Sequence, residues 1–141
     1  MMPDIKHLLS INAPAETVYN AVTTQEGVAG WWTTENTTSN EVGGDAEFTF
    51  GDRYHDRMRI LALEPGRRVE WECLEGDPEW VGTTFVFDLE PVEGATRLRF
   101  SHSGWREATD FFANCNFHWG FYLQSLKDYC EGEPGKPFQA R

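Results

Sequence analysis

The sequence predicts an α+β fold in which an antiparallel sheet of about six to seven strands packs against one long C-terminal helix. Two observations predict it. Consecutive segments between Ala46 and His102 alternate apolar and polar residues, the pattern of antiparallel strands with one buried and one solvated face. Residues 110–131 then repeat apolar side chains at helical spacing. A long helix that follows such strands must cover their apolar face.

The N-terminal part predicts one strand and two short helices. Residues 5–11 alternate, and the helix that follows runs to about Thr23, because Pro14 and Glu16 suit a first helical turn. A second short turn of helix is predicted at 27–32. The predicted inward face of the first strand is Ile5, His7, Leu9 and Ile11.

Five further strands are predicted after a polar stretch, residues 33–44, that is interpreted as a loop. Turn sequences such as Pro65-Gly66 and Glu93-Gly94 separate them. Their predicted inward faces are Ala46, Phe48 and Phe50; Met58, Ile60 and Ala62; Val69, Trp71 and Cys73; Phe85, Phe87 and Leu89; and Thr96, Leu98, Phe100 and His102.

The helix at residues 110–131 has one narrow apolar stripe, and Gly132 and Pro134 end it. Phe117 and Phe121 lie outside this stripe. They predict a partner surface, including a homodimer, unless the segment 105–110 folds back over them. The stripe consists of Phe112, Cys115, Trp119, Leu123, Leu126 and Cys130.

Composition narrows the function classes. The 141 residues predict a single domain, 1–141, and the net charge of −11 disfavours nucleic acids and anionic membranes as partners. We expect a cytoplasmic protein without membrane insertion, because the N-terminus lacks the apolar run of a signal peptide and no stretch approaches a spanning helix. The three cysteines are too few and too widely spaced for a disulfide framework or a zinc site.

Four stretches, in order, resemble the SRPBCC (START-like) superfamily, and within it the group named for the activator of heat-shock-protein-90 ATPase. They are INAPAETVY at 11–19 with Gly30-Trp31-Trp32, EPGRRVEW at 64–71, TRLRFSHSGW at 96–105, and His118-Trp119-Gly120 followed by Leu123, Leu126-Lys127 and Gly132.

The resemblance implies a helix-grip fold, in which a curved sheet wraps around the C-terminal helix and leaves a hydrophobic cavity. Members of the superfamily bind lipids, hormones or polyketides, and some are cyclases or hydratases. In the co-chaperone that gives the group its name, this domain accompanies a separate N-terminal domain.

Large side chains on the inward faces are expected to line that cavity, although such patterns are also typical of a packed core. Polar inward groups would orient a ligand, and His102 is the candidate acid or base, with a neutral imidazole if it is buried. The predicted ligand contacts are Trp32, Phe48, Phe50, Met58, Trp71, Phe85, Phe87, His102, Phe112, Cys115, Asn116, Trp119 and Leu123.

Two further clusters have alternative interpretations. Trp31 and Trp32 either form a movable gate, made pliable by Gly27 and Gly30, or one of them packs under the sheet and the other is exposed. The group Asp52, His55 and Asp56 is interpreted as a solvated hairpin tip rather than a metal site.

No motif for nucleophilic catalysis, metal binding or phosphate binding is present, so we expect neither a metal nor a cofactor. The predicted function is binding of a small hydrophobic molecule in a cavity of roughly 300–1,000 Å³. The alternatives are a cyclase or hydratase that uses His102, or a stress-related co-chaperone that acts through its Phe117 and Phe121 surface.

Overall fold

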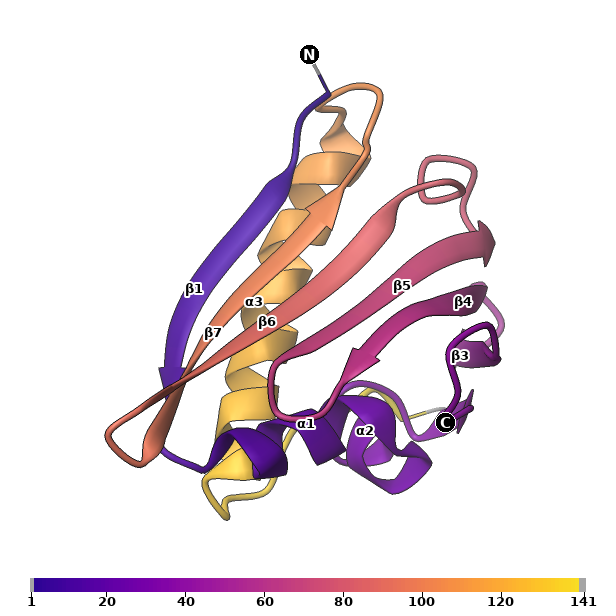
Figure 1. Ribbon diagram of the computed structural model, residues 1–141. Coiled ribbons are helices and arrows are strands. Elements are labelled where there is room, and N and C mark those ends of the chain that lie inside the picture. The colour runs from indigo at the N-terminus through magenta and orange to yellow at the C-terminus, as the bar shows by residue number, and fades with distance from the viewer. Residues whose placement is uncertain (1, 140–141) are drawn as a thin grey trace.

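The computed structural model describes residues 2–139 and contains a seven-stranded sheet, two short helices and one long helix (Figure 1). The predicted α+β class and the order of the main elements are confirmed. The elements are β1 (Ile5–Ile11), α1 (Ala15–Thr23), α2 (Gln25–Trp31), β2 (Glu35–Thr38), β3 (Asp45–Phe50), β4 (Tyr54–Glu64), β5 (Arg68–Glu75), β6 (Thr84–Val92), β7 (Ala95–Ser103) and α3 (Asp110–Cys130).

The sheet is antiparallel throughout, with the strand order β1-β7-β6-β5-β4-β3-β2. Strands β2 to β7 therefore form a meander, and β1 pairs with the last strand. In β6 and β7 the inward pairs are Phe85 with His102 and Phe87 with Phe100. All four side chains are buried, as the alternation predicts.

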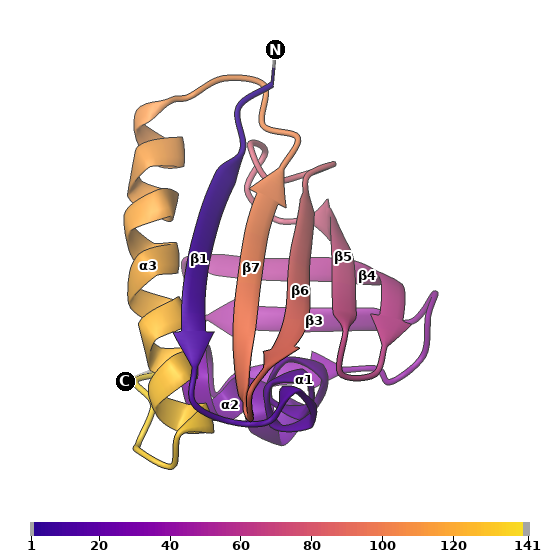
Figure 2. The same ribbon diagram turned by 60° about the vertical axis from the view of Figure 1, so that its left-hand side comes forward.

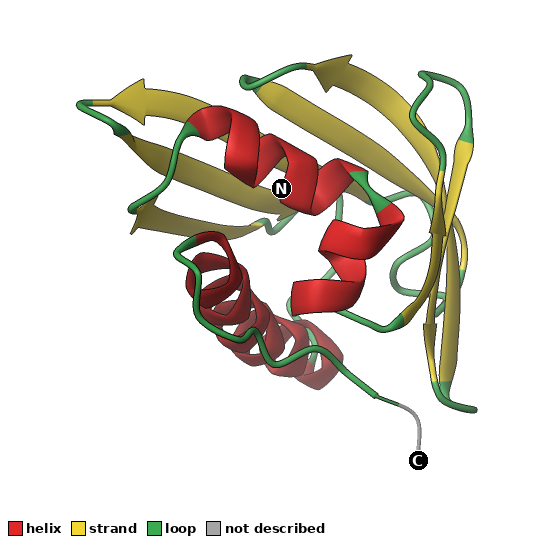
Figure 3. Cartoon of the chain, turned by 90° about the horizontal axis from the view of Figure 1, so that it is seen from below, coloured by secondary structure: helices red, strands yellow, loops and turns green. Residues whose placement is uncertain are grey.

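The sheet curves around α3. Register shifts interrupt the β4–β5 pairing between Arg57 and Met58 and between Ile60 and Ala62, and such bulges bend and twist a strand. In Figure 2, β3 and β4 run across the direction of β1, β7 and β6. Figure 3 shows α1 and α2 packed inside the same curve at one end of α3. Helices α1 and α2 therefore occupy the inside of the curved sheet at one end of α3 only.

Two features of the sheet differ from the sequence-based expectation. The predicted loop at 33–44 contains the edge strand β2, whose polar residues hide the alternation; Asn36 points inward and its amide donates to the carbonyl oxygens of Gln25 and Thr33. The second bulge of β4 reverses the faces after Ile60. Leu63, and not the predicted Ala62, therefore packs against the core, opposite Val69.

Aromatic rings fill the space where the sheet meets the helices. The Trp32 ring centroid lies 4.5 Å from that of Phe48, 5.2 Å from that of Trp119 and 6.1 Å from that of Trp71. Burying each such side chain contributes roughly 1.5–3 kcal/mol. This cluster fixes α2, α3 and the sheet relative to one another. Within residues 2–139, no helix combines the length and apolar character needed to cross a bilayer.

Candidate functional site

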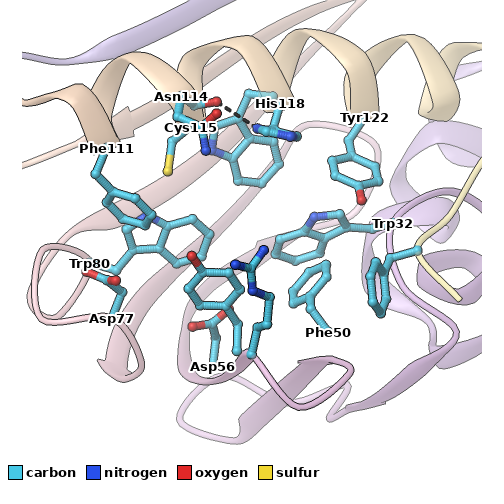
Figure 4. A pocket seen from close by; sticks show the side chains of 14 residues that line it. Trp32, Phe50, Asp56, Asp77, Trp80, Phe111, Asn114, Cys115, His118 and Tyr122 are labelled. Atoms are coloured by element: carbon cyan, nitrogen blue, oxygen red, sulfur yellow. Dashed lines mark hydrogen bonds between the residues drawn. The ribbon is translucent and has the colours of Figure 1, made fainter. Parts of the chain in front are cut away.

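A pocket of about 240 Å³ opens between α3 and the loops at one end of the sheet (Figure 4). Its volume is slightly below the range of about 300–1,000 Å³ that is usual for ligand sites, so it suits a small molecule. Most of its lining side chains are aromatic. They are Trp32, Phe50, Arg53, Tyr54, Asp56, Asp77, Trp80, Phe111, Asn114, Cys115, His118, Trp119, Tyr122 and Phe138.

Helix α3 supplies one wall of the pocket. Its six contributing residues follow one another at intervals that alternate between three positions and one, which places them on one face of a helix. Thr109 begins the helix, because its hydroxyl accepts a hydrogen bond from the Phe112 amide (3.1 Å). The six residues are Phe111, Asn114, Cys115, His118, Trp119 and Tyr122.

The predicted ligand contacts fall into three groups. Trp32, Phe50, Cys115 and Trp119 line the pocket. A second group is buried in the core away from the pocket and fixes the shape of the fold: Phe48, Met58, Trp71, Phe85, Phe87, His102 and Leu123. The third group is Phe112 and Asn116.

Phe112 and Asn116 lie on the flank of α3 that faces away from the pocket. The Asn116 side chain is hydrogen-bonded to His7 Nε2 of β1 (3.0 Å), and Phe112 packs edge-on against Trp105. Successive residues of a helix are rotated by about 100°, so the pocket flank carries Asn114 and His118 in their place. Asn116 therefore does not line this pocket.

His102 is enclosed and both of its ring nitrogens are occupied. Trp119 Nε1 donates to Nδ1 (3.2 Å), and Nε2 lies 2.8 Å from Thr83 Oγ1. The Thr83 hydroxyl donates to the Trp80 carbonyl (2.6 Å), so it accepts the proton of Nε2. Burial lowers the pKa of His102 to about 3. The imidazole is therefore neutral, as expected, but this geometry leaves no ring nitrogen for proton exchange with a ligand.

Asp56, which the sequence analysis interpreted as part of a solvated hairpin tip, is instead a buried polar group of the pocket. It lies opposite Phe48 in the β3–β4 ladder and is only 2% exposed. Its Oδ1 has no hydrogen-bond partner among the described residues. Burial raises the pKa of this carboxyl to about 7, with a further upward contribution from Asp77 and an opposing one from His55. The alternation of the strand predicts that Asp56 faces inward, because it lies two residues before the inward Met58.

The three residues of the hairpin tip do not act together. His55 points to the outer face, where its ring is hydrogen-bonded to Thr49 Oγ1 (2.9 Å) and Glu47 Oε1 (2.7 Å), and Asp52 is exposed. Asp56 alone turns inward, since neighbouring strand residues face opposite sides. Among residues 2–139, no group of three or more His, Cys, Asp or Glu side chains is arranged to hold a metal ion.

Trp31 and Trp32 are both packed in the core, so neither is the exposed member of the pair. Trp31 Nε1 donates to the Ala21 carbonyl (2.8 Å), and both rings are buried. The neighbouring glycines serve close packing: a Cβ at Gly27 would collide with the backbone of Ala21, and one at Gly30 would overlap the ring of Tyr129. The doublet therefore packs beneath the sheet, and Trp32 forms the floor of the pocket.

The C-terminal segment forms another wall that the sequence did not predict. The Phe138 amide donates to the Trp32 carbonyl (2.7 Å), and the Phe138 ring packs against Phe50 at 5.7 Å. Ser125 of α3 holds the segment, because its hydroxyl donates to the Trp31 carbonyl and accepts from the Lys136 amide. The segment contains few apolar residues, so no periodicity revealed its position.

The outer face of α3 carries an exposed aromatic pair. Phe117 is 74% exposed and Phe121 is 47% exposed. The segment 105–110 does not cover these rings, because Trp105 is buried against Phe111 and Phe112. Within the described residues, Phe117 and Phe121 therefore remain on the surface, beside the turns of helix that carry Asn114 and His118.

Comparison with protein families gives one match that covers most of the chain. Residues 12–131 match the family described as Activator of Hsp90 ATPase homolog 1-like protein. The comparison with curated proteins gives no match.

Solved structures share the whole fold. The solution structure of the Aha1 dimer from Colwellia psychrerythraea is 38% identical, with a TM-score of 0.88 over 95% of this chain and 100% of that chain. Protein MLL2253 from Mesorhizobium loti is 20% identical, with a TM-score of 0.81 over 89% and 95% of the two chains. DynU16, from the dynemicin biosynthetic locus, is 23% identical, with a TM-score of 0.79 over 96% of this chain and 50% of that chain. The last two show the similarity of fold alone.

Proposed function

This chain belongs to the family of Activator of Hsp90 ATPase homolog 1-like proteins, and on that premise we propose that it binds a small, mostly apolar molecule in the pocket beside α3. One observation carries the proposal: a cavity of about 240 Å³ remains between the sheet and the helix, and aromatic rings form most of its wall. Cavities of this kind bind ligands by removing apolar surface from water.

The pocket residues come from segments that the core holds in place. Trp32 and Trp119 pack against each other and against β-sheet residues, while Ser125 anchors the segment that carries Phe138. A preformed site loses little conformational entropy when a ligand enters. The arrangement therefore favours a binding site over a defect of packing.

The experiment is a titration of the purified protein with 1-methylnaphthalene, followed by tryptophan fluorescence and by calorimetry. The matched variants are Cys115→Phe, which adds a ring inside the pocket, and Ala113→Phe, which adds the same ring at an exposed position of α3. We expect saturable binding to the wild type and to Ala113→Phe, and a loss of about tenfold or more in affinity for Cys115→Phe. Circular dichroism checks that both variants fold.

Two outcomes would overturn this proposal. The first is the absence of saturable binding to the wild type. The second is equal affinity for a folded Cys115→Phe variant, which would place the probe elsewhere on the surface.

A second property is proposed for the outer face of α3: that Phe117 and Phe121 form the interface of a homodimer. Two observations support it, namely the exposure of both rings and the dimeric state of the relative from Colwellia psychrerythraea at 38% identity. Exposed aromatic pairs of this kind are typical of protein interfaces.

Sedimentation velocity tests the dimer. Phe121→Glu places a charge in the interface and should give monomers, whereas Thr37→Glu adds the same charge at an exposed position of β2, outside α3, and should leave dimers. A wild type that sediments as a monomer, or a Phe121→Glu variant that stays dimeric, contradicts the assignment. Binding of 1-methylnaphthalene should be the same in all three proteins.

A further inference from the structure

The pocket contains one buried carboxyl group that lacks a partner among the described residues. Asp56 is 2% exposed, and its Oδ1 has no hydrogen-bond partner in the part of the chain that is described. None of the ion pairs found among residues 2–139 includes it. Buried carboxyl groups are normally hydrogen-bonded or paired with a cation, so this one requires an explanation.

The backbone leaves space for the carboxyl group. Gly76 follows β5 with a φ of +154°, and a Cβ at this position would overlap Asp56 Oδ1. The Asp56 side chain therefore lies between the Gly76 backbone and the pocket that it helps to line. It takes this position because it shares the inward face of β4 with Met58 and Ile60.

The surrounding charges do not neutralise it. Asp77, from the β5–β6 loop, lines the same end of the pocket (Figure 4) and adds a second acid, with its own Oδ1 accepting from the Glu79 amide. Arg53 also lines the pocket but is exposed, and among the described residues it forms neither a hydrogen bond nor an ion pair with Asp56. Cys73 carries a thiol whose pKa burial raises to about 12. His55 faces outward, and His118 lies across the pocket, bonded to the Asn114 carbonyl.

We infer that the ligand of this pocket is an apolar ring compound that carries a protonated amine, and that the Asp56 carboxyl receives this amine. The inference rests on the proposed binding function and names the ligand class for the same site. The amine supplies a hydrogen-bond donor and a positive charge, neither of which the described residues provide to this carboxyl group.

The aromatic rings nearby suit the same group. Tyr54 and Phe111 face each other across the mouth with centroids 6.4 Å apart, and Trp80 lies between Asp77 and α3. Aromatic faces attract ammonium groups, most strongly where water is excluded. A ligand with an apolar ring would fill the space beside Trp32 and Trp119 while its amine reaches Asp56.

The test uses three probes that differ in one group: 1-naphthylmethylamine, 1-naphthalenemethanol and 1-methylnaphthalene. Each is titrated by calorimetry at pH 8 into the wild type, Asp56→Asn and Asp52→Asn. Asp52→Asn removes the same charge from the exposed part of the same hairpin. We expect the wild type and Asp52→Asn to prefer the amine over 1-methylnaphthalene by about tenfold or more, and Asp56→Asn to lose that preference.

Asp56→Asn should still bind 1-methylnaphthalene saturably, which shows that this variant keeps a folded pocket. Equal affinities for the three probes, a preference for the alcohol over the amine, or an amine preference that survives in Asp56→Asn would each overturn the inference while leaving the binding function intact. A wild type that binds none of the probes removes the binding function, and the inference with it.

Discussion

Trp119 Nε1 donates a hydrogen bond to His102 Nδ1 across 3.2 Å and so joins α3 to β7 inside the core. The bond has two effects. It fixes the tautomer of His102, because the indole can only donate. It also fixes the rotation of α3, which decides that Asn114 and His118, and not Asn116, face the pocket.

Replacing Trp119 by Phe should therefore destabilise the protein more than the same change at Trp80. The first change leaves His102 Nδ1 without a partner in a buried position, which costs about 1–3 kcal/mol. Trp80 Nε1 has no hydrogen-bond partner within the described chain, so Trp80→Phe loses no such bond. Urea denaturation of both variants measures the difference, and equal losses would show that the bond contributes nothing.

The contribution of Asp56 to the stability of the wild type should fall as pH rises from about 4 to about 7, while that of His102, whose pKa burial lowers to about 3, should rise over much of the same interval. Burial moves the pKa of Asp56 from 3.8 to about 7, so this carboxyl binds more protons in the folded state than in the unfolded state in this interval. The stabilisation is complete below pH 4 and is lost as pH passes the folded pKa. The titratable and charged groups that lie around the Asp56 carboxyl, or line the pocket with it, are His55, Asp77, Cys73, Arg53, Tyr54 and His118.

Asp56→Asn should remove the contribution of Asp56 and leave the opposing one of His102, so the stability of the variant should rise across this interval. The variant should match the wild type near pH 4 and exceed its free energy of unfolding by at most about 4 kcal/mol above pH 7, whereas Asp52→Asn should follow the wild type. Guanidinium denaturation at pH 4, 6 and 8 is the measurement. A wild type and Asp56→Asn variant with parallel pH profiles would refute the buried titration.

Replacing Phe138 by Ala should weaken ligand binding without unfolding the protein. Phe138 is a wall of the pocket, and truncating an aromatic contact in a binding site commonly costs more than 1 kcal/mol, or about tenfold in affinity at 1.4 kcal/mol. Gln139→Ala changes an exposed neighbour and serves as the control. Titration with 1-methylnaphthalene distinguishes them; identical affinities would exclude the C-terminal segment from the site.

Two glycines should respond in opposite directions to substitution by Ala. A Cβ at Gly30 would overlap the Tyr129 ring, so Gly30→Ala should destabilise by about 1–3 kcal/mol. A Cβ at Gly120 would meet only His7 Cε1 at 3.7 Å, and Ala is favoured by about 1 kcal/mol within a helix. Thermal unfolding of both variants tests the packing of α2 on α3. A change of stability of the same sign in both variants would contradict this packing.

Periodicity predicted most of the fold because the large inward side chains carry it. The faces of β6, β7 and α3 follow directly from Phe85, Phe100 and Trp119 and their neighbours at periods of 2 and 3.6. The pattern failed where the backbone breaks it, at the bulge before Ala62, and where polar residues form an edge strand, as at Asn36.

The pocket was harder to predict, because a cavity depends on which rings fail to meet. Phe48 and Phe50 belong to the same strand face, but the first is buried in the core and the second lines the pocket. Asp56 could have been assigned from the strand phase, whereas Phe138 reaches the site only through backbone bonds to Trp32. Tertiary contacts of this kind leave no local pattern.

The resonances of the indole Nε1 protons provide the most direct test of ligand binding beside α3. Addition of 1-methylnaphthalene to ¹⁵N-labelled protein should shift the signals of Trp32, Trp80 and Trp119, which line the pocket, along saturable curves with one common affinity. The signal of Trp31, whose Nε1 is bonded to Ala21 in the core, should remain in place. Unchanged pocket indoles, with shifts confined to amides around Phe117 and Phe121, would contradict a binding cavity.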